Sequence, residues 1–225
     1  MKIIIIPARM NSKRFRGKAL KKINNFEILK ILINRLKKVR HIKKFVISTT
    51  KNKIDNKIIN FCKREKISFD RGDSLNVAKR LFKTAKKFKA KYFVRINGDS
   101  PFIHYNIIDK AIKIYKKKKV DIVTNIFPRT FPIGQSVEVI RTDTLGKNLK
   151  FFKKKKYKEH VTKYFYDNYK MFKIINIKNG KNFSNFSLAI DTKKDFNKFK
   201  NLNLTNGELV NLDMKKILKK FYEEN

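Results

Sequence analysis

An apolar run near the amino terminus leads directly into a dense group of cations. The run is KIIII at 2–6, and the residues after it carry five cationic side chains, namely Arg9, Lys13, Arg14, Arg16 and Lys18. Like charges this close repel one another, so the segment favours a bound anion. Arg binds phosphate oxygens as a planar fork, and Lys binds them as a point charge. The group therefore predicts a phosphate-binding loop.

Acidic residues follow other apolar segments of the sequence. Asp73 lies in RGDS, Asp99 lies in NGDSPFI, and Asp191 comes directly after FSLAI. If these segments are strands of a parallel sheet, the acids share one edge with the cationic loop, because ligands bind beyond the carboxyl ends of such strands. Mg²⁺ needs only one or two protein carboxylates when phosphate and water supply its other oxygens. Cations and spaced carboxylates together predict a metal–triphosphate site.

The elements that must position these side chains alternate between strands and helices. Short apolar or β-branched runs predict strands at 2–6, 44–49, 67–70, 91–96 and 120–125. Apolar residues at helical spacing predict helices at 26–39, 55–66, 74–88 and 105–118. This order predicts an α/β fold with a mostly parallel, Rossmann-like sheet and helices on both faces.

After residue 125 the regular alternation ends. We expect a loop feeding a strand at 131–140, a helix at 159–169, strands at 171–178 and 186–190, and an amphipathic helix at 213–225. Asp191 and Thr192 are both candidates for the N-cap of a further helix. The 225 residues suffice for one sizeable core, so one domain spanning 1–225 is expected.

Composition and missing motifs restrict the class of protein. No stretch approaches the ~20 apolar residues of a membrane span, and the opening run is too short for a signal segment, so a cytoplasmic location is expected. The single cysteine, Cys62, excludes an internal disulfide and shares an apolar helical stripe with Ile58, which indicates core packing. Because Gly17-Lys18 precedes Ala19, the loop is not a Walker A motif, and it is not G-x-G-x-x-G. These absences argue against P-loop kinases and dinucleotide oxidoreductases.

The formal net charge of +40 admits two interpretations. Lys is spread along the whole chain, and Asn, Ile, Phe and Tyr are also abundant, which is typical of an AT-rich genome. Such a field attracts anions of any kind. The rival class is a basic RNA-binding protein, which predicts exposed aromatics among the cations or a recognised RNA-binding module. No such module is found, so no nucleic-acid partner is expected.

Six collinear blocks span about residues 3–199. They are IIPARMNSKRFRGKAL, RGDSLNVAKRL, VRINGDSPFI, FPIGQSVEVI, KEHVTKYF and LAIDTKKDF. In the first block, the pattern A-R-x-x-S-x-R-x-P-x-K is matched by Ala8, Arg9, Ser12, Arg14 and Lys18, whereas Arg16 replaces the proline. In these blocks the chain resembles the cytidylyltransferases that activate sugar acids, which include the CMP-KDO and CMP-acylneuraminate synthetases. The order and spacing are most similar to the SpsF-like branch.

The resemblance implies a fold and a reaction. The implied fold is of the nucleotide-diphospho-sugar transferase type, with a small β-containing insert at about 127–175 that contacts substrate and forms a homodimer. The implied reaction transfers CMP from CTP to the hydroxyl of a sugar acid and releases pyrophosphate, with Mg²⁺ as cofactor. It would serve surface polysaccharide or glycan biosynthesis. A sugar-phosphate nucleotidyltransferase that uses another nucleoside triphosphate is a close alternative.

The resemblance also implies site residues, carried over by position. The triphosphate and its catalytic chemistry would involve Arg9, Arg14, Lys18 and Asp99. The nucleotide pocket would add Ala8, Ser12, Thr49, Thr50, Arg71 and Asp73. Asp99 and Asp191 would hold Mg²⁺, and the acceptor sugar would face Gln135, Glu138, His160 and Thr162. Each has a structural alternative: Asp99 as a turn residue, Asp191 as an N-cap, or Glu138 as the partner of a cation.

Overall fold

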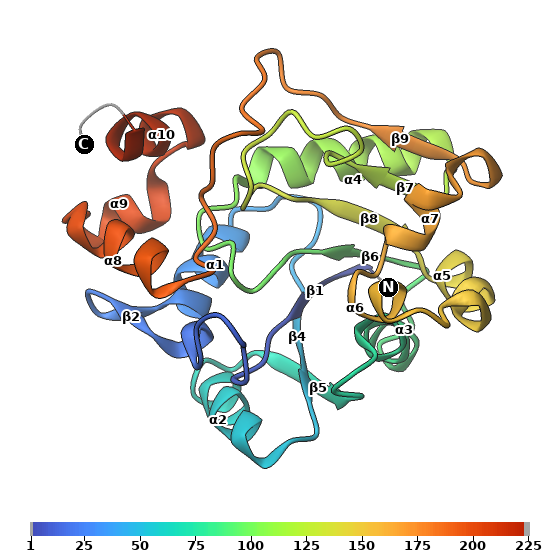
Figure 1. Cartoon of the computed structure of the whole chain (residues 1–225), viewed down its shortest axis with the longest axis horizontal. Helices are drawn as coiled ribbons and strands as arrows, with labels where there is room; N and C mark the ends of the chain where they lie inside the picture. Colours follow the sequence, from blue (N-terminus) through green and yellow to red (C-terminus); the bar gives the residue numbers. More distant parts are fainter. Residues whose placement is uncertain (1, 223–225) are drawn as a thin grey trace.

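A seven-stranded sheet forms the centre of the molecule (Figure 1). The computed structural model describes residues 2–222. The strands run in the order β5-β4-β1-β6-β8-β7-β9, and every neighbouring pair is parallel except the two that involve β8. Their bounds are β1 (Lys2–Pro7), β4 (Phe45–Thr50), β5 (Ser68–Gly72), β6 (Tyr92–Arg95), β7 (Ile122–Thr124), β8 (Glu138–Arg141) and β9 (Ile174–Asn176). The predicted mostly parallel α/β sheet is confirmed.

Helices pack against both faces of this sheet. They are α1 (Ile28–Leu36), α2 (Asn56–Arg64), α3 (Val77–Lys87), α4 (Tyr105–Lys118), α5 (Thr142–Asn148), α6 (Lys155–Glu159) and α7 (Lys163–Asp167). The isoleucines of β1 are fully buried and alternate between the faces. Ile4 and Ile6 pack with α1, α2 and α4, whereas Ile3 and Ile5 pack with α3, α5 and α7. A strand covered on both faces needs apolar side chains throughout, which explains the run KIIII.

Three helices at the carboxyl end add a separate apolar cluster beside α1 (Figure 1). They are α8 (Lys193–Asn201), α9 (Asn206–Asn211) and α10 (Met214–Tyr222), and a hairpin of β2 (Lys22–Ile23) and β3 (Phe26–Glu27) precedes α1. Buried Arg35 of α1 fastens this cluster, because its guanidinium donates to the carbonyls of Leu209 and Leu212 at 3.1 and 2.6 Å. None of the helices within residues 2–222 is long and apolar enough to cross a membrane.

The predicted helix at 159–169 is confirmed only over Lys163–Asp167, because the chain forms two short helices there. α6 ends at Glu159 and α7 begins at Lys163. Val161 and Thr162 between them are buried, and the Thr162 hydroxyl donates to Glu138. The turn between α6 and α7 therefore interrupts the helix and places Val161 and Thr162 in the core.

The predicted strand at 186–190 is wrong. The segment makes an isolated bridge between Ser187 and Ile133, and then passes the end of β6, where the Ile190 N–H donates to the Asp99 carbonyl at 2.9 Å. The strand expected within 131–140 is confirmed only from Glu138 onward, as β8. Both differences arise from contacts between distant segments, which local patterns do not encode.

The direction of β8 decides which residues meet at the carboxyl edge of the sheet. Because β8 is antiparallel to both neighbours, its first residue, Glu138, lies in register with Arg95 at the end of β6 and with Thr124 at the end of β7. The edge that carries the ends of the parallel strands therefore also carries the start of β8.

Candidate active site

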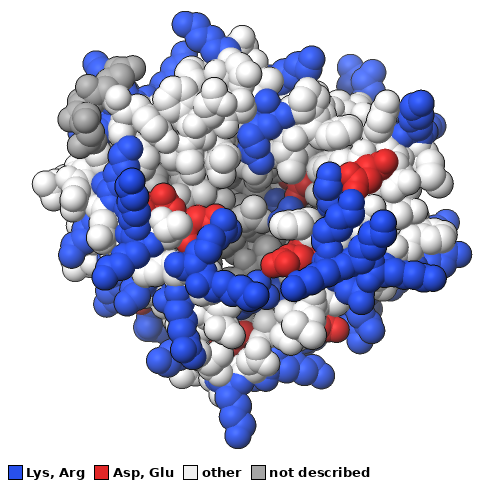
Figure 2. Space-filling model, viewed as in Figure 1, with Lys and Arg blue, Asp and Glu red and all other residues white. Residues whose placement is uncertain are grey.

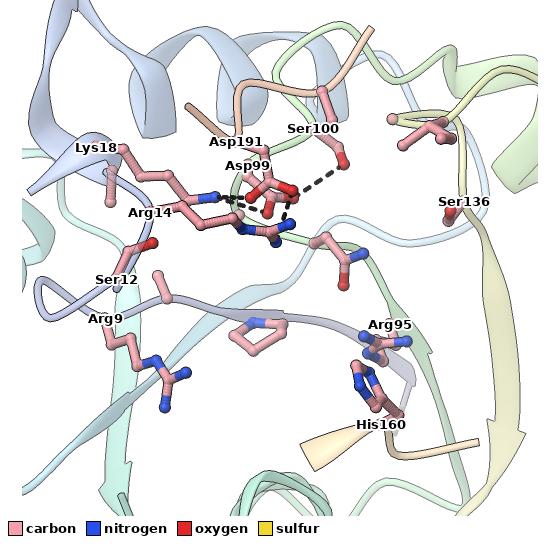
Figure 3. A pocket seen from close by; sticks show the side chains of 18 of the residues that line it. Arg9, Ser12, Arg14, Lys18, Arg95, Asp99, Ser100, Ser136, His160 and Asp191 are labelled. Atoms are coloured by element: carbon pink, nitrogen blue, oxygen red, sulfur yellow. Dashed lines mark hydrogen bonds and ion pairs between the residues drawn. The ribbon is translucent and has the colours of Figure 1, made fainter. Parts of the chain in front are cut away.

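A cavity of about 350 Å³ opens at this edge, around the end of β1 (Figure 3). The chain adds β4 and β5 on one side of β1 and then crosses to add β6 on the other, which is the usual position of a ligand site in such sheets. The walls come from the loop after β1, the turn after β6, the loop before β8 and the segment before α8. Figure 2 shows cations spread over this face, with carboxylates around the hollow at its centre.

Two acids and two cations meet in one part of the cavity, here called the carboxylate corner: Arg14, Lys18, Asp99 and Asp191 (Figure 3). Lys18 Nζ lies 2.9 Å from Asp99 Oδ2 and 2.8 Å from Asp191 Oδ1. Arg14 Nη2 lies 2.6 Å from Asp191 Oδ2. Two carboxylates that converge on one ammonium would repel each other without it, so the geometry creates a place for positive charge.

The same two carboxylates suit a divalent metal ion. Their hard oxygen donors come from separate segments and face one point, and Lys18 supplies a single positive charge there. No group of three or more His, Cys, Asp or Glu side chains within residues 2–222 is arranged to hold a metal. Phosphate and water would have to supply the other ligands, so the donor set fits a metal that arrives with a nucleotide.

Close packing of the turn after β6 places Asp99. A Cβ on Gly98 would lie 2.9 Å from the Pro7 carbonyl oxygen, so only glycine lets this turn approach the end of β1. The hydrogen bond from Ile190 to the Asp99 carbonyl then ties the segment that carries Asp191 to the same turn.

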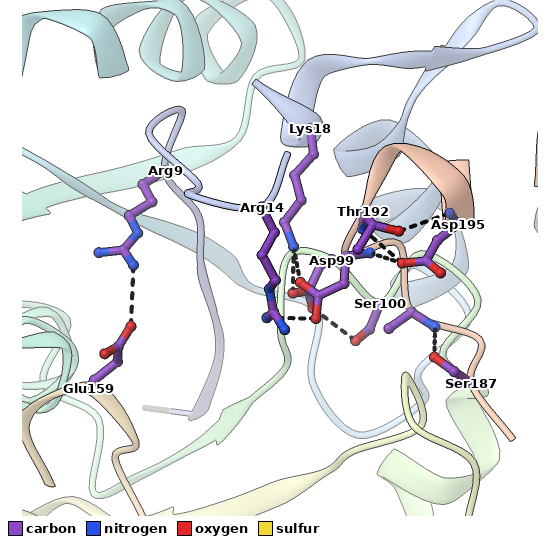
Figure 4. A network of polar contacts seen from close by, with 11 residues as sticks. Arg9, Arg14, Lys18, Asp99, Ser100, Glu159, Ser187, Thr192 and Asp195 are labelled. Carbon is purple, nitrogen blue, oxygen red and sulfur yellow. Dashed lines mark hydrogen bonds and ion pairs between the residues drawn. The ribbon is translucent and has the colours of Figure 1, made fainter. Parts of the chain in front are cut away.

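Helix capping leaves Asp191 available to the cavity. Thr192 is the N-cap of α8: its hydroxyl accepts from the Asp195 N–H at 3.1 Å, and the Asp195 carboxylate accepts from the Thr192 N–H at 2.8 Å (Figure 4). The sequence left Asp191 and Thr192 as alternatives for this cap, and the structure assigns it to Thr192.

A buried acid anchors the loop after β1. Asp55, which is 1% exposed, accepts a hydrogen bond from the Met10 N–H at 2.7 Å through Oδ1 and another from the Thr50 hydroxyl through Oδ2. The Gly17 N–H closes the loop by donating to the Met10 carbonyl at 2.8 Å. This anchoring holds Ala8 and Ser12, which both line the cavity as expected from the sequence.

Arg9 lines the cavity on a different side from the carboxylate corner (Figure 4). Its guanidinium lies 3.4 Å from the Ser74 carbonyl oxygen and 3.4 Å from Glu159 Oε1 at the end of α6. Both contacts are long and the Glu159 side chain is exposed, so they hold Arg9 weakly. An incoming anion can replace them.

Four residues expected in the nucleotide pocket lie beside the cavity instead of lining it. Thr49 and Thr50 are buried, and Thr50 supports Asp55. Arg71 Nε donates to the Thr50 carbonyl at 3.0 Å. Asp73 accepts from two backbone N–H groups at the start of the loop before α3, and these bonds lower its pKa. None of these four residues lines the cavity.

Of the residues expected to face an acceptor, only His160 lines the cavity. Gln135 is fully buried; its side chain accepts from the His104 N–H at 2.9 Å and donates to the Phe102 carbonyl at 2.8 Å. Glu138 and Thr162 are buried and bonded to each other. The alternative of a cation partner for Glu138 is confirmed, since it forms an ion pair with Arg95.

Several cations that were not predicted from the sequence also line the cavity. Arg80, which is 2% exposed, lies there with its Nε lacking a hydrogen-bond partner, and burial lowers its pKa to about 10. Arg95, Ser136 and His160 lie on another side of the cavity from the carboxylate corner (Figure 3), and Arg129 joins them through a 3.0 Å contact with Ser136; we call these four residues the arginine wall. Arg95 stands inside the VRINGDSPFI block, and Arg129 stands two residues before FPIGQSVEVI. Their positions inside or next to these sequence blocks could have identified them as candidate site residues.

Comparison with known proteins agrees with this description. The fold and the site define a nucleotidyltransferase, and the family model described as "Cytidylyltransferase" matches residues 3–224. The chain therefore belongs to the cytidylyltransferase family.

Individual relatives resemble almost the whole chain. An uncharacterized protein of Methanocaldococcus jannaschii, MJ1063, is 35% identical over 97% of this chain and 89% of its own length. The spore coat polysaccharide biosynthesis protein SpsF of Bacillus subtilis is 26% identical over 92% of this chain and 88% of its own length. A cytidylyltransferase structure from Leptospira borgpetersenii superposes with a TM-score of 0.89 at 28% identity, covering 97% and 94% of the two chains.

Proposed function

We propose that this protein transfers CMP from CTP to the hydroxyl of a sugar acid and releases pyrophosphate. The observation that carries the proposal is the carboxylate corner, where Asp99 and Asp191 converge on the Lys18 ammonium at 2.9 and 2.8 Å. Membership of the cytidylyltransferase family supports CTP as the donor. The name of the SpsF relative supports a role in surface polysaccharide or glycan synthesis.

This function assigns a binding role to the residues on each side of the cavity. Asp99 and Asp191 would hold a divalent metal, Mg²⁺ in our proposal, which supplies positive charge to the transferred phosphoryl group and to the leaving pyrophosphate. Arg14 and Lys18 would exchange their carboxylate partners for phosphate oxygens. Arg9 would bind phosphate oxygens from its own side of the cavity, together with Ser12 and the loop amides.

Group transfer requires mainly positioning and electrostatic stabilisation. The acceptor hydroxyl oxygen attacks the α-phosphorus, the bond from that phosphorus to the pyrophosphate oxygen breaks, and the hydroxyl proton passes to solvent. Little covalent work falls to the protein in such a step. Fixed cations around the phosphates stabilise the negative charge that grows on them, and the anchored loop after β1 holds these cations in place.

The proposal includes the setting of the enzyme. A cytoplasmic location fits CTP as substrate, and a homodimer would form through the segment at about 127–175. Exposed Phe151, Tyr169 and Met171 lie in or next to the helices of this segment and offer apolar area for such an interface. Light scattering at high protein concentration tests the dimer, and a monomer alone would contradict it.

The reaction is tested by pyrophosphate release with each of four nucleoside triphosphates, in the presence of Mg²⁺, against a panel of sugar acids and sugar 1-phosphates. We expect release with CTP and at least one sugar acid, and loss of release when the metal is chelated. Turnover of sugar 1-phosphates with another triphosphate would instead establish the related sugar-phosphate nucleotidyltransferase. Steeply salt-dependent RNA binding without turnover would favour the RNA-binding class.

A further inference from the structure

Two arginines on the arginine wall keep part of their hydrogen-bonding capacity unused. Arg95 is 15% exposed, lines the cavity, and has a buried Nε without a hydrogen-bond partner. Arg129 lines the same cavity; its Nη2 donates to the Ser136 hydroxyl at 3.0 Å, and its Nη1 lies 3.4 Å from the Pro132 carbonyl oxygen. Each guanidinium carries five N–H donors, so most donors of this pair have no hydrogen-bond partner within residues 2–222.

A buried network behind the wall fixes Arg95. Glu138, which is 1% exposed, accepts from Arg95 through Oε2, while Oε1 accepts from the Thr162 hydroxyl and from the Tyr166 hydroxyl, the latter at 2.8 Å. Burial and the neighbouring Glu138 raise the pKa of Tyr166, so its hydroxyl stays protonated and donates. Burial lowers the pKa of Arg129, and the charge of Glu138 opposes this shift. Glu138 therefore pairs directly with Arg95, and its charge also favours the charged form of Arg129.

From this arrangement we infer that Arg95 and Arg129 bind the carboxylate of the acceptor. The inference rests on the proposed function and names the part of the acceptor that this enzyme recognises. Two cations and one buried anion leave a net charge of about +1, which matches a single carboxylate better than a phosphate dianion. A planar guanidinium is also the group that binds a planar carboxylate with two parallel hydrogen bonds.

The position of the wall assigns it to the acceptor and not to the nucleotide. The cations that surround the carboxylate corner come from the loop after β1, whereas Arg95, Ser136 and His160 come from β6, the loop before β8 and the turn between α6 and α7 (Figure 3). The two groups lie on different sides of the cavity. Glu138 and Thr162 thus contribute as positioning residues, through Arg95, without touching the acceptor.

The test compares wild type, Arg129→Gln and Arg95→Lys in the pyrophosphate-release assay. The acceptors are 3-deoxy-manno-octulosonate, N-acetylneuraminate and glucuronate, each paired with its carboxamide, at saturating CTP and Mg²⁺. We expect wild type to use at least one acid and not its carboxamide. For that acid, Arg129→Gln should raise KM at least ~30-fold while the KM for CTP changes less than ~2-fold. Arg95→Lys, which keeps the charge and loses the fork, should raise the acceptor KM by a smaller factor.

A matched control and two opposing outcomes make the test decisive. Arg40→Gln removes the same charge from an exposed residue in the loop before β4, and it should leave both KM values unchanged. Equal use of acid and carboxamide, or a rise in the KM for CTP with an unchanged KM for the acid, would overturn the inference and leave the proposed function intact. No pyrophosphate release with any acid, from an enzyme that binds CTP and Mg²⁺, would overturn both.

Discussion

The carboxylate corner and the arginine wall hold their cations by different means. In the corner, Arg14 and Lys18 pair directly with acids that themselves line the cavity, and Arg14 is 68% exposed. In the wall, the acid that holds Arg95 is buried behind it and 1% exposed. Under the proposed function, contacts of the first kind would exchange when phosphates and a metal bind, whereas contacts of the second kind would persist through the reaction. The same cavity thus contains cations paired with accessible acids and a cation paired with a buried acid.

Glu138→Ala should give the largest effect, on stability. Removing one partner of a buried ion pair leaves Arg95 uncompensated and should lower the free energy of unfolding by about 3–5 kcal/mol. Urea denaturation measures this change. Glu159→Ala, which removes the acid of the exposed pair with Arg9, should cost about 0–1 kcal/mol. Similar losses in the two variants would show that the two kinds of pair do not differ.

Asp99→Asn should keep the fold and lower kcat at least ~100-fold, because the charge that holds the metal is reduced. Pyrophosphate release measures the rate, and thermal unfolding checks the fold. Asp143→Asn, at an exposed position in α5, makes the same chemical change away from the cavity and should leave the rate unaltered. A near-normal rate for Asp99→Asn would remove this residue from the site.

Lys18→Ala should raise the KM for CTP, lower kcat, or both, for a combined loss of about tenfold in kcat/KM. The ammonium is expected to leave Asp99 and Asp191 for the phosphates, so its loss affects binding of the nucleotide and not of the acceptor. Separate titrations of CTP and of the sugar acid distinguish the two. Lys22→Ala, an exposed change in β2, provides the comparison. Unchanged constants for CTP would contradict the phosphate role.

Asp55→Asn should give the smallest effect. An Asn oxygen can still accept from the Met10 N–H, so the loop stays anchored, although the charge and the acceptor for the Thr50 hydroxyl are lost. We expect kcat/KM for CTP to fall about fivefold, equivalent to about 1 kcal/mol. Asp55→Ala removes the acceptor entirely and should cost clearly more. If both variants match wild type, the anchoring of the loop does not matter for turnover.

The carboxylate corner could be predicted further from the sequence than the arginine wall. KIIII, the cationic loop and Asp99 are neighbours in sequence or follow strands with clear apolar patterns, and parallel-sheet topology brings the strand ends together. Asp191 could be assigned to the site because it stands in the block LAIDTKKDF, although the predicted strand before it does not form. Local pattern and general topology were sufficient there.

The arginine wall depended on information that local pattern does not contain. Arg95 and Glu138 are 43 residues apart and meet through the antiparallel register of β6 and β8. Glu138 was expected to face the acceptor or to pair with a cation, and it is buried where the hydroxyls of Thr162 and Tyr166 donate to it. The break at His160, which lets Thr162 turn inward, is likewise set by this tertiary contact and overrides helical periodicity.

The reversed orientation of β8 has a consequence for how specificity can change. Because β8 starts where its neighbours finish, residues 126–162, which run from the end of β7 to the start of α7, supply three of the four residues of the arginine wall, and Arg95 of β6 supplies the fourth. Sequence drift confined to that segment could redirect the enzyme to a new sugar while the donor half stays untouched. Exchanging residues 126–162 between homologues should therefore transfer acceptor preference without altering the choice of nucleotide.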